Sequence, residues 1–280
     1  MDILKQRPTW LFFTLTFLVS WSFWIPAALL GQEAMTFPTI LLYFLGGCGP
    51  SLVGILFLYL DPDRDTRRDF WRRVIDFRRI QGDWYGSIIL IFPAVAALSI
   101  ALNQLLGGPL PPLPVFLQLL DQPALLIPLF ISTLIGGPLS EELGWRGFAL
   151  DRLQVRWKPL VASLILGLFW WAWHLPLFFI QGSPQSVWGF GTAMFWLFLI
   201  GVFPLSVLIT WAYNQNRRSI LSAILIHFFY NLTISVVYPL PPQVEVLRVV
   251  LSILVVALVI RLSRPKPTQE LEIQAQDQGG

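Results

Sequence analysis

Long apolar stretches alternate with short charged segments along almost the whole chain. A membrane-spanning helix needs about 20 mostly apolar residues. Stretches that can supply at least one span each are 10–31, 39–60, 85–120, 122–140, 159–216, 219–244 and 246–262. The stretch 159–216 has room for two helices with a break near GSPQS, and 85–120 has room for one helix and the loop GGPLPPLP. The pattern therefore predicts an all-α, polytopic transmembrane helical bundle of about eight spans.

The same pattern predicts the domain organisation. We expect a single transmembrane domain over residues 1–264, because no stretch has the composition of a separate soluble domain. The last residues, 265–280, read PKPTQELEIQAQDQGG and contain little that can be buried. Such a composition is typical of a disordered tail.

Basic residues indicate the orientation of the spans. Lys and Arg are enriched on cytoplasmic flanks. If the N-terminus with Lys5 and Arg7 is inside, then the second, fourth and sixth loops and the tail are inside as well. These segments hold Arg64, Arg67, Arg68, Arg72, Arg73, Arg78, Arg79, Arg152, Arg156, Lys158, Arg217, Arg218, Arg261, Arg264 and Lys266. Arg248 is the exception. The distribution predicts that both termini are cytoplasmic.

Composition narrows the class of partner. Hydrophobic residues make up 55% of the chain and charged residues 12%, about half the charged fraction of a soluble domain. The net charge of +3 comes from the basic residues that mark the cytoplasmic side. Such residues interact favourably with anionic lipid. We therefore expect the lipid bilayer as a partner and no nucleic acid.

Six polar residues in the apolar stretches are candidates for chemistry. Ionisable groups in a membrane core are costly, so they tend to face the bundle interior and to carry function. The candidates are Glu141, Glu142, Arg146, His174, His227 and Asn231, which include both histidines of the chain. Measured along straight helices, these groups lie in the inner half to the middle of the bilayer. We expect them to converge in a cavity open to the cytoplasmic side.

Spacing assigns partners to some of them. Residues four apart share a helix face, so Glu142 can pair with Arg146 and His227 can act with Asn231. Glu141 points about 100° away from Glu142 around the helix axis, so we expect it to face the reaction centre. The preceding GGPLS is a poor continuing helix, and Ser140 is a good N-cap for a new one. The aromatic residues nearby, Trp170, Trp171, Trp173, Phe228 and Phe229, are expected to pack or to face lipid.

These residues, in this order, resemble the CPBP family of intramembrane proteases, also called the type II CAAX prenyl endopeptidase and bacteriocin-processing family, or the Abi family. Its pattern is EExxxR, FxxxH and HxxxN on successive transmembrane helices. EELGWR at 141–146 and HFFYN at 227–231 match, whereas Trp170 stands where the second motif has Phe. The similarity covers about residues 120–240.

The resemblance implies hydrolysis of a peptide bond in a membrane-associated or prenylated, CAAX-like protein or peptide, in a bacterial or archaeal cell membrane. Glu141 and His174 would activate a water, His227 and Asn231 would stabilise the oxyanion, and Glu142 and Arg146 would support them. Two mechanisms stay open. Glu141, His174 and His227 could ligate Zn²⁺ in a three-ligand open site, as in a metalloprotease, or the protein could be a metal-free glutamate protease.

Two other classes of function use similar residues. One is a non-enzymatic membrane scaffold or bacteriocin immunity factor, which has no need for two acids, two imidazoles and an amide together. The other is a proton-coupled transporter, in which Glu and His line a pathway. Transporters often consist of two repeated halves with paired broken helices, and the sequence shows no such repeat. The sequence therefore favours the protease.

Overall fold

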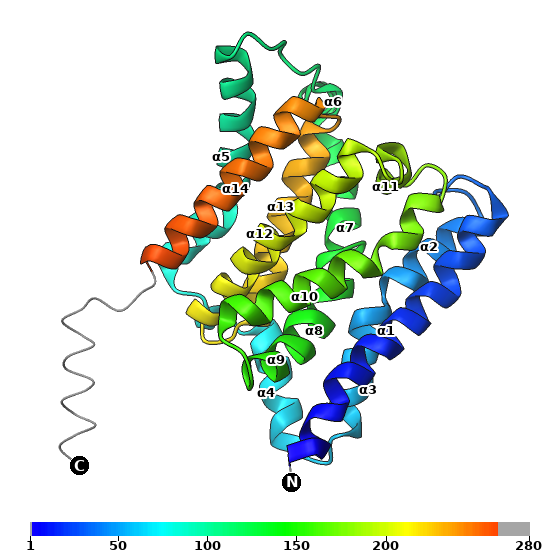
Figure 1. Ribbon diagram of the computed structural model, residues 1–280, viewed down its shortest axis with the longest axis vertical. Coiled ribbons are helices and arrows are strands. Elements are labelled where there is room, and N and C mark those ends of the chain that lie inside the picture. The colour runs from blue at the N-terminus through cyan, green and yellow to red at the C-terminus, as the bar shows by residue number, and fades with distance from the viewer. Residues whose placement is uncertain (1, 263–280) are drawn as a thin grey trace.

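The computed structural model describes residues 2–262, with side chains from residue 9 onward, and within that range it is a helical bundle without strands (Figure 1). The α-helices are α1 (Asp2–Leu30), α2 (Thr39–Gly47), α3 (Gly49–Leu60), α4 (Arg64–Ile75), α5 (Gly82–Leu105), α6 (Pro114–Asp121), α7 (Leu126–Ile135), α8 (Pro138–Gly144), α9 (Asp151–Gln154), α10 (Pro159–Trp173), α11 (Pro184–Trp188), α12 (Ala193–Gln215), α13 (Ile220–Val237) and α14 (Pro242–Leu262). Short 3₁₀ turns are η1 (Phe77–Arg79), η2 (Pro123–Leu125) and η4 (Leu175–Phe179), and η3 (Trp145–Leu150) is a π-helix. The all-α prediction is confirmed, and the predicted tail at 265–280 lies outside the described residues.

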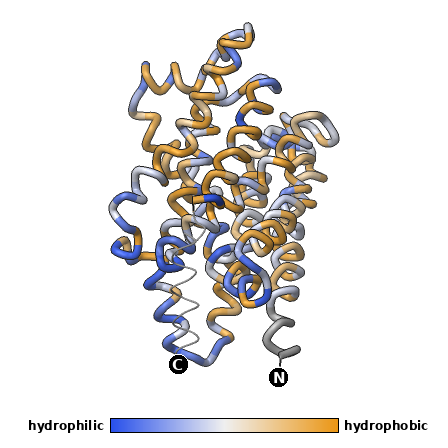
Figure 2. The backbone as a smooth tube through the Cα atoms, turned by 60° about the vertical axis from the view of Figure 1, so that its left-hand side comes forward, coloured by the Kyte–Doolittle hydropathy of each residue, from blue (hydrophilic) through white to orange (hydrophobic). Residues whose placement is uncertain are grey.

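The helices are long and apolar enough for a multi-pass membrane protein. In the described range, 7 helices meet the requirements for a span, and 8 do so if the bent pair α2 and α3 is one span. These two helices meet at Cys48 with a bend of 46°. Apolar residues dominate the body of the bundle, while hydrophilic segments gather at one end (Figure 2). The protein is therefore an integral membrane protein with about the number of spans that the hydropathy pattern predicts.

The span that carries the acidic pair is interrupted. Helix α7 ends at Ile135, and α8 starts at Pro138 with Gly137 as the residue before its first turn. Ser140 is therefore inside α8, where its hydroxyl donates to the Gly137 carbonyl at 2.8 Å, and the predicted N-cap role of Ser140 is wrong. The physical reason is that proline suits the first helical position, which needs no N–H partner. The break still places Glu141 in the first turn of α8.

Close backbone contact fixes α8 against α3. A methyl group on Gly54 would lie 2.8 Å from the Gly144 Cα, and one on Gly144 would collide with the Pro50 carbonyl. Small residues allow this approach, as they do at many membrane helix interfaces. The π-helix η3 follows directly, and all of its residues are buried. Such segments are frequent at functional sites, and here the segment starts with Trp145 and Arg146.

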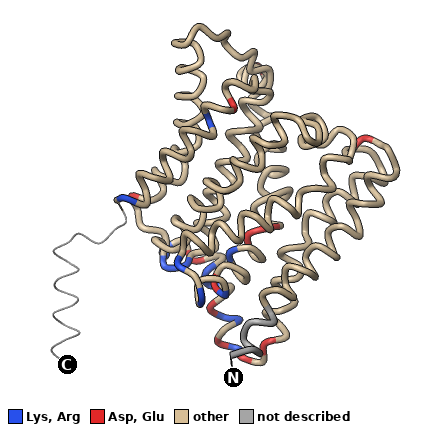
Figure 3. The backbone as a smooth tube through the Cα atoms, viewed as in Figure 1, with Lys and Arg blue, Asp and Glu red and all other residues tan. Residues whose placement is uncertain are grey.

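Charged residues gather at one end of the bundle (Figure 3). There Asp151 accepts from Arg73 at 2.9 Å and from the Tyr213 hydroxyl at 2.6 Å, and it also pairs with Arg218. The hydrogen bond to Asp151 raises the pKa of the Arg218 guanidinium. These contacts join α4, α9, α12 and the loop before α13 at the polar end of the bundle.

Arg248, the exception in the basic pattern, lies in α14 away from that end. Its Nε donates to Glu245 Oε2 at 2.6 Å, and both side chains are buried. Its guanidinium also contacts the Tyr230 hydroxyl at 3.5 Å. Because Arg248 is paired inside the bundle, it adds no net positive charge to the opposite end.

Candidate active site

Glu141 is held by two indole groups. Its Oε2 accepts from Trp170 Nε1 at 2.5 Å and from Trp145 Nε1 at 3.3 Å. The side chain is only 5% exposed, so these donors replace much of the hydration that a carboxylate has in water. Both bonds go to one oxygen, which leaves Oε1 available on a residue that lines a cavity. Glu141, and not Glu142, therefore lines the cavity.

Glu142 lies in a different environment and has different partners. Its Oε1 accepts from Arg146 Nη1 at 2.9 Å and from His227 Nδ1 at 2.8 Å. Glu142 and Arg146 are both 0% exposed, and the guanidinium also donates to Ser206 Oγ at 3.3 Å. The pairing expected from the spacing of Glu142 and Arg146 is present, whereas the contact with His227 was not predicted. A buried ion pair of this kind is sensitive to the loss of either partner.

His227 and Asn231 share one face of α13, as their spacing predicts. Asn231 Nδ2 and His227 Nε2 are 3.2 Å apart. Because the Glu142 carboxylate can only accept, His227 carries a proton on Nδ1. In the neutral ring Nε2 then accepts from the Asn231 amide, and in the charged ring Nε2 becomes a donor. Glu142 therefore fixes the orientation of His227 and the position of the proton on its ring.

His174 is at the end of α10, where it has a defined tautomer. Its Nδ1 lies 2.7 Å from the Trp170 carbonyl oxygen. A carbonyl oxygen only accepts hydrogen bonds, so Nδ1 carries the proton of the neutral ring. Nε2 then has a free lone pair that can accept a proton. Trp170 thus contacts both Glu141, through its indole, and His174, through its backbone.

Trp170 is a residue whose role the sequence analysis missed. We expected it to pack or to face lipid, and its indole does pack beneath the Arg146 guanidinium, 4.8 Å from the ring centroid. It also donates to Glu141, which the Phe of the family pattern cannot do. The sequence feature that could have indicated this contact is the departure from FxxxH at position 170.

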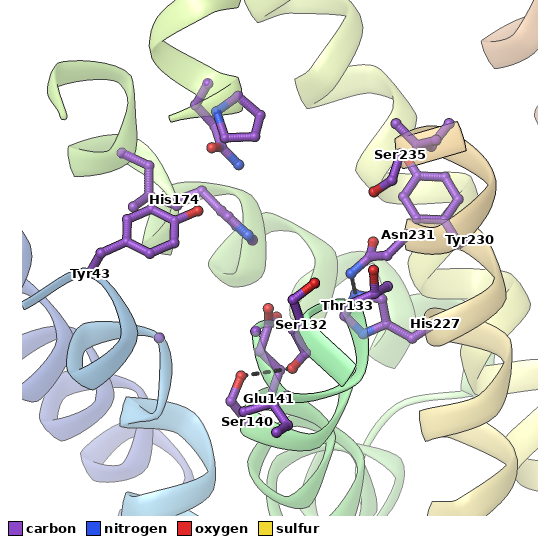
Figure 4. A pocket seen from close by; sticks show the side chains of 18 of the residues that line it. Tyr43, Ser132, Thr133, Ser140, Glu141, His174, His227, Tyr230, Asn231 and Ser235 are labelled. Atoms are coloured by element: carbon purple, nitrogen blue, oxygen red, sulfur yellow. Dashed lines mark hydrogen bonds between the residues drawn. The ribbon is translucent and has the colours of Figure 1, made fainter. Parts of the chain in front are cut away.

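Four of the six candidates line one cavity. Glu141, His174, His227 and Asn231 come from α8, α10 and α13 and surround a space of about 520 Å³ (Figure 4). Glu142 and Arg146 do not line it and lie behind Glu141 and His227. The size is that of a pocket for a small ligand or a few residues of a peptide.

Other polar side chains reach the same cavity. They are Tyr43, Ser132, Thr133, Ser140, Gln185, Tyr230, Ser235 and Tyr238. Tyr43 is a candidate for contact with a bound molecule, because its hydroxyl points into the cavity from the side of His174 (Figure 4). It comes from α2, outside the three motifs, and nothing in the spacing of the sequence marks it. A phenol in this position can donate a hydrogen bond to a bound substrate.

The cavity extends to the end of the bundle opposite the arginine-rich segments. There it is lined by Met35, Pro184, Gln185, Trp188 and Tyr238, in the segments that join α1 to α2, η4 to α12 and α13 to α14. Exposed residues of α7 and the turn after it, Ser132, Ile135 and Gly136, line its side. No residue of the arginine-rich segments 61–81, 155–158 or 216–219 lines it. The expectation that the cavity opens to the cytoplasmic side stays a prediction.

The predicted zinc ligands do not form a metal site as they are placed. Glu141 Oε1 and His174 Nε2 have no partner that would keep them from a metal, so the bonds to Glu141 Oε2 and to the two Nδ1 atoms do not decide the question. The positions of the side chains do: across the described residues, no group of three or more His, Cys, Asp or Glu side chains could hold a metal ion. The open, three-ligand arrangement of a catalytic zinc is therefore not formed.

A carboxylate, two imidazoles and an amide around one cavity in a helical membrane bundle indicate an intramembrane hydrolase. Residues 123–233 match the family model described as type II CAAX prenyl endopeptidase Rce1-like. Over 235 residues the chain is 31% identical to CAAX prenyl protease 2 of Methanococcus maripaludis. The aligned region covers 81% of this chain and 84% of that relative. The chain belongs to the type II CAAX prenyl endopeptidase family, so the resemblance drawn from the three motifs is confirmed.

Proposed function

We propose that this protein is an intramembrane endopeptidase that hydrolyses a peptide bond of a membrane-associated or prenylated, CAAX-like protein or peptide. The family and the name of the archaeal relative support a protease over a scaffold, an immunity factor or a transporter. The observation that carries the mechanism is the arrangement at Glu141, whose Oε2 is held by two indoles while its residue lines a cavity shared with His174.

In this proposal Glu141 and His174 activate a water molecule. Glu141 Oε1 and His174 Nε2 are the free acceptor atoms on the two residues, and a water between them would lose a proton as it attacks. Trp170 keeps both acceptors in place through its indole and its carbonyl. A general base in a fixed position contributes about 10²–10⁴ in rate.

Asn231 and His227 serve the other half of the reaction. The attack adds hydroxide to the scissile carbonyl carbon and leaves negative charge on the carbonyl oxygen. An N–H of Asn231 donates to that oxygen, and so does Nε2–H of a His227 ring whose Nδ1 is held by Glu142 at 2.8 Å. The C–N bond then breaks, and the proton taken from water passes to the leaving amine, which completes the addition of water across the peptide bond.

Glu142 and Arg146 are positioning residues in this proposal. They do not touch the cavity, but together they set the orientation of His227. We propose a mechanism without a metal, because no three His, Cys, Asp or Glu side chains of the described residues are placed to hold one.

The test is hydrolysis by purified protein in proteoliposomes. Two peptides of one sequence, with and without a farnesyl group on the CAAX cysteine, are compared by mass spectrometry of the products. We expect wild type to release the residues after the modified cysteine and Glu141→Gln to release none. If unfarnesylated peptide is cleaved equally well, a prenyl group is no part of recognition. If Glu141→Gln matches wild type on both peptides, the assigned role of Glu141 is contradicted.

A further inference from the structure

The hydroxyl of Tyr43 reaches the cavity without a partner from the protein itself. Tyr43 lines the cavity from α2, and its hydroxyl points inward from the side of His174 (Figure 4). Among the residues that the structure describes, this hydroxyl has no hydrogen-bond partner. The hydroxyls of Ser132 and Ser140 line the same cavity but donate to backbone carbonyls three residues earlier. The Tyr43 hydroxyl, which can donate and accept, is therefore available to a bound molecule.

Packing fixes the position of Tyr43 relative to His174. The Trp24 indole of α1 donates to the Tyr43 carbonyl at 2.8 Å. A methyl group on Gly46 would collide with the Trp24 ring, so α2 lies directly against it. The rings of Trp24 and Trp173 are 4.5 Å apart between centroids, and the rings of Trp173 and His174 are 4.7 Å apart. This series of contacts holds Tyr43 and His174 in one packed unit.

The polar groups of the cavity lie on two walls with Glu141 between them. Asn231 and His227 come from α13 on one side, and Tyr43 and His174 lie on the other (Figure 4). In the proposed reaction the oxygen of the scissile carbonyl points to the α13 wall, where Asn231 and His227 donate to it. The wall that carries Tyr43 then faces a different part of the substrate.

The geometry of a peptide indicates which part this is. The backbone of an extended peptide repeats every two residues, so successive carbonyl groups point to opposite sides. When the scissile carbonyl points to α13, the carbonyls directly before and after it along the chain point to α2. A carbonyl that loses its water in the cavity needs a donor. Of the described residues that line the cavity, Glu141 is the only Asp, Glu, Lys or Arg, and its carboxylate cannot donate, whereas the Tyr43 phenol can.

We propose that the Tyr43 hydroxyl donates a hydrogen bond to a backbone carbonyl that flanks the scissile carbonyl, and so holds the substrate in an extended conformation between α2 and α13. This inference rests on the proposed function, from which it takes the direction of the scissile carbonyl. It adds a substrate-binding residue outside the three motifs and the conformation of the bound segment. The hydroxyl acts on binding of the peptide and not on the attacking water.

Binding is measured without hydrolysis, in a Glu141→Gln background. The probe is a farnesylated CAAX peptide with a fluorophore at its N-terminus. Its Kd is obtained from fluorescence anisotropy with protein in nanodiscs, and empty nanodiscs give the contribution of lipid alone. Tyr43→Phe removes the hydroxyl and keeps the ring, so we expect Kd to rise about 5–50-fold, the loss for a buried carbonyl without its donor.

Tyr59→Phe in the same background is the matched control. Tyr59 is on α3, is 57% exposed and does not line the cavity, so its Kd and melting temperature should equal those of Glu141→Gln alone. An unchanged Kd in Tyr43→Phe, with an unchanged melting temperature, overturns the proposal whatever the hydrolysis assay shows.

A second test removes the acceptor instead of the donor. One peptide bond at a time is replaced by a trans-alkene isostere, which keeps the extended shape and lacks the carbonyl. At one of the two positions that flank the scissile carbonyl, we expect the isostere to raise Kd about as much as Tyr43→Phe does, and to have little further effect in Tyr43→Phe. Equal fold losses with and without the Tyr43 hydroxyl at every position contradict the proposed contact.

Hydrolysis by protein with Glu141 intact separates this proposal from the function on which it rests. We expect Tyr43→Phe to lower kcat/KM about 5–50-fold, mainly through KM. A lower kcat with an unchanged Kd would assign the hydroxyl to the chemical step and contradict its role in binding. If wild type cleaves no peptide, the proposed function is overturned, while the Kd values still decide whether Tyr43 binds the peptide.

Discussion

The Trp170 indole donates a hydrogen bond of 2.5 Å to Glu141 Oε2 while the Trp170 carbonyl accepts one of 2.7 Å from His174 Nδ1. One residue of α10 therefore positions both groups that we assign to water activation. The family pattern has Phe at this position, so the bond to Glu141 is a feature of this chain that can be removed without removing the aromatic ring.

Replacement of Trp170 by Phe is expected to lower kcat/KM by about 10–100-fold, because a hydrogen bond to a charged group contributes about 1.5–3 kcal/mol. The loss is partial since Trp145 still donates to the same oxygen. The melting temperature in detergent should change little. Trp171→Phe is the matched control, because the buried Trp171 Nε1 has no hydrogen-bond partner among the described residues. Equal activity of the two variants would show that the bond to Glu141 has no part in catalysis.

The two adjacent acids should respond differently to the same change. Glu141→Gln keeps the shape of the side chain but cannot take a proton, so we expect normal expression and melting with no hydrolysis. Glu142→Gln leaves Arg146 buried without a negative partner, which destabilises a protein by about 3–5 kcal/mol. Arg146→Ala should resemble it in melting.

Melting and hydrolysis measured together for these three variants decide the assignment. Substantial activity in Glu141→Gln, combined with a stable and inactive Glu142→Gln, would mean that the two roles are reversed.

His227 and Asn231 should behave as one unit. They are in contact at 3.2 Å, and an oxyanion hole that loses one donor loses about 10²–10³ in kcat. His227→Ala and Asn231→Ala should each show a loss of this size, and the double variant should be little worse than either. Thr233→Val, on the same helix but with its hydroxyl on the Phe229 carbonyl, is the control. Multiplicative losses in well-folded protein would assign the two residues to separate steps.

Chelation tests the absence of a metal from the proposed mechanism. Dialysis against EDTA or 1,10-phenanthroline should leave kcat unchanged, because Glu141, His174 and His227 are not placed to hold a metal ion together. A loss of activity that added Zn²⁺ restores, with no change in melting temperature, would require a different arrangement of Glu141, His174 and His227 in the active protein.

Local patterns were sufficient for the parts of this account that depend on a single helix. Hydropathy predicted the spans because each one is a continuous apolar segment, and a spacing of four predicted the contacts of Glu142 with Arg146 and of His227 with Asn231. These relationships follow from the geometry of one helix and need no knowledge of packing.

Contacts between helices were beyond reach from one sequence. Glu142 meets His227 across 85 positions of the chain, and only the packing of α8 against α13 decides that contact. The cavity depends in the same way on packing, because its lining comes from helices far apart in the sequence. Ser140 was misplaced by a few residues because Pro138 and Ser140 are both good residues for the start of a helix.

The most direct test of the central claim counts new protein ends in the membrane. Membranes from cells that carry wild type or Glu141→Gln at equal abundance are compared by quantitative proteomics of labelled N-termini. If Glu141 activates the attacking water, we expect internal cleavage sites in membrane-associated proteins that are present with wild type and absent with Glu141→Gln. If the same new termini occur at the same abundance in both membranes, Glu141 does not catalyse peptide-bond hydrolysis in this protein.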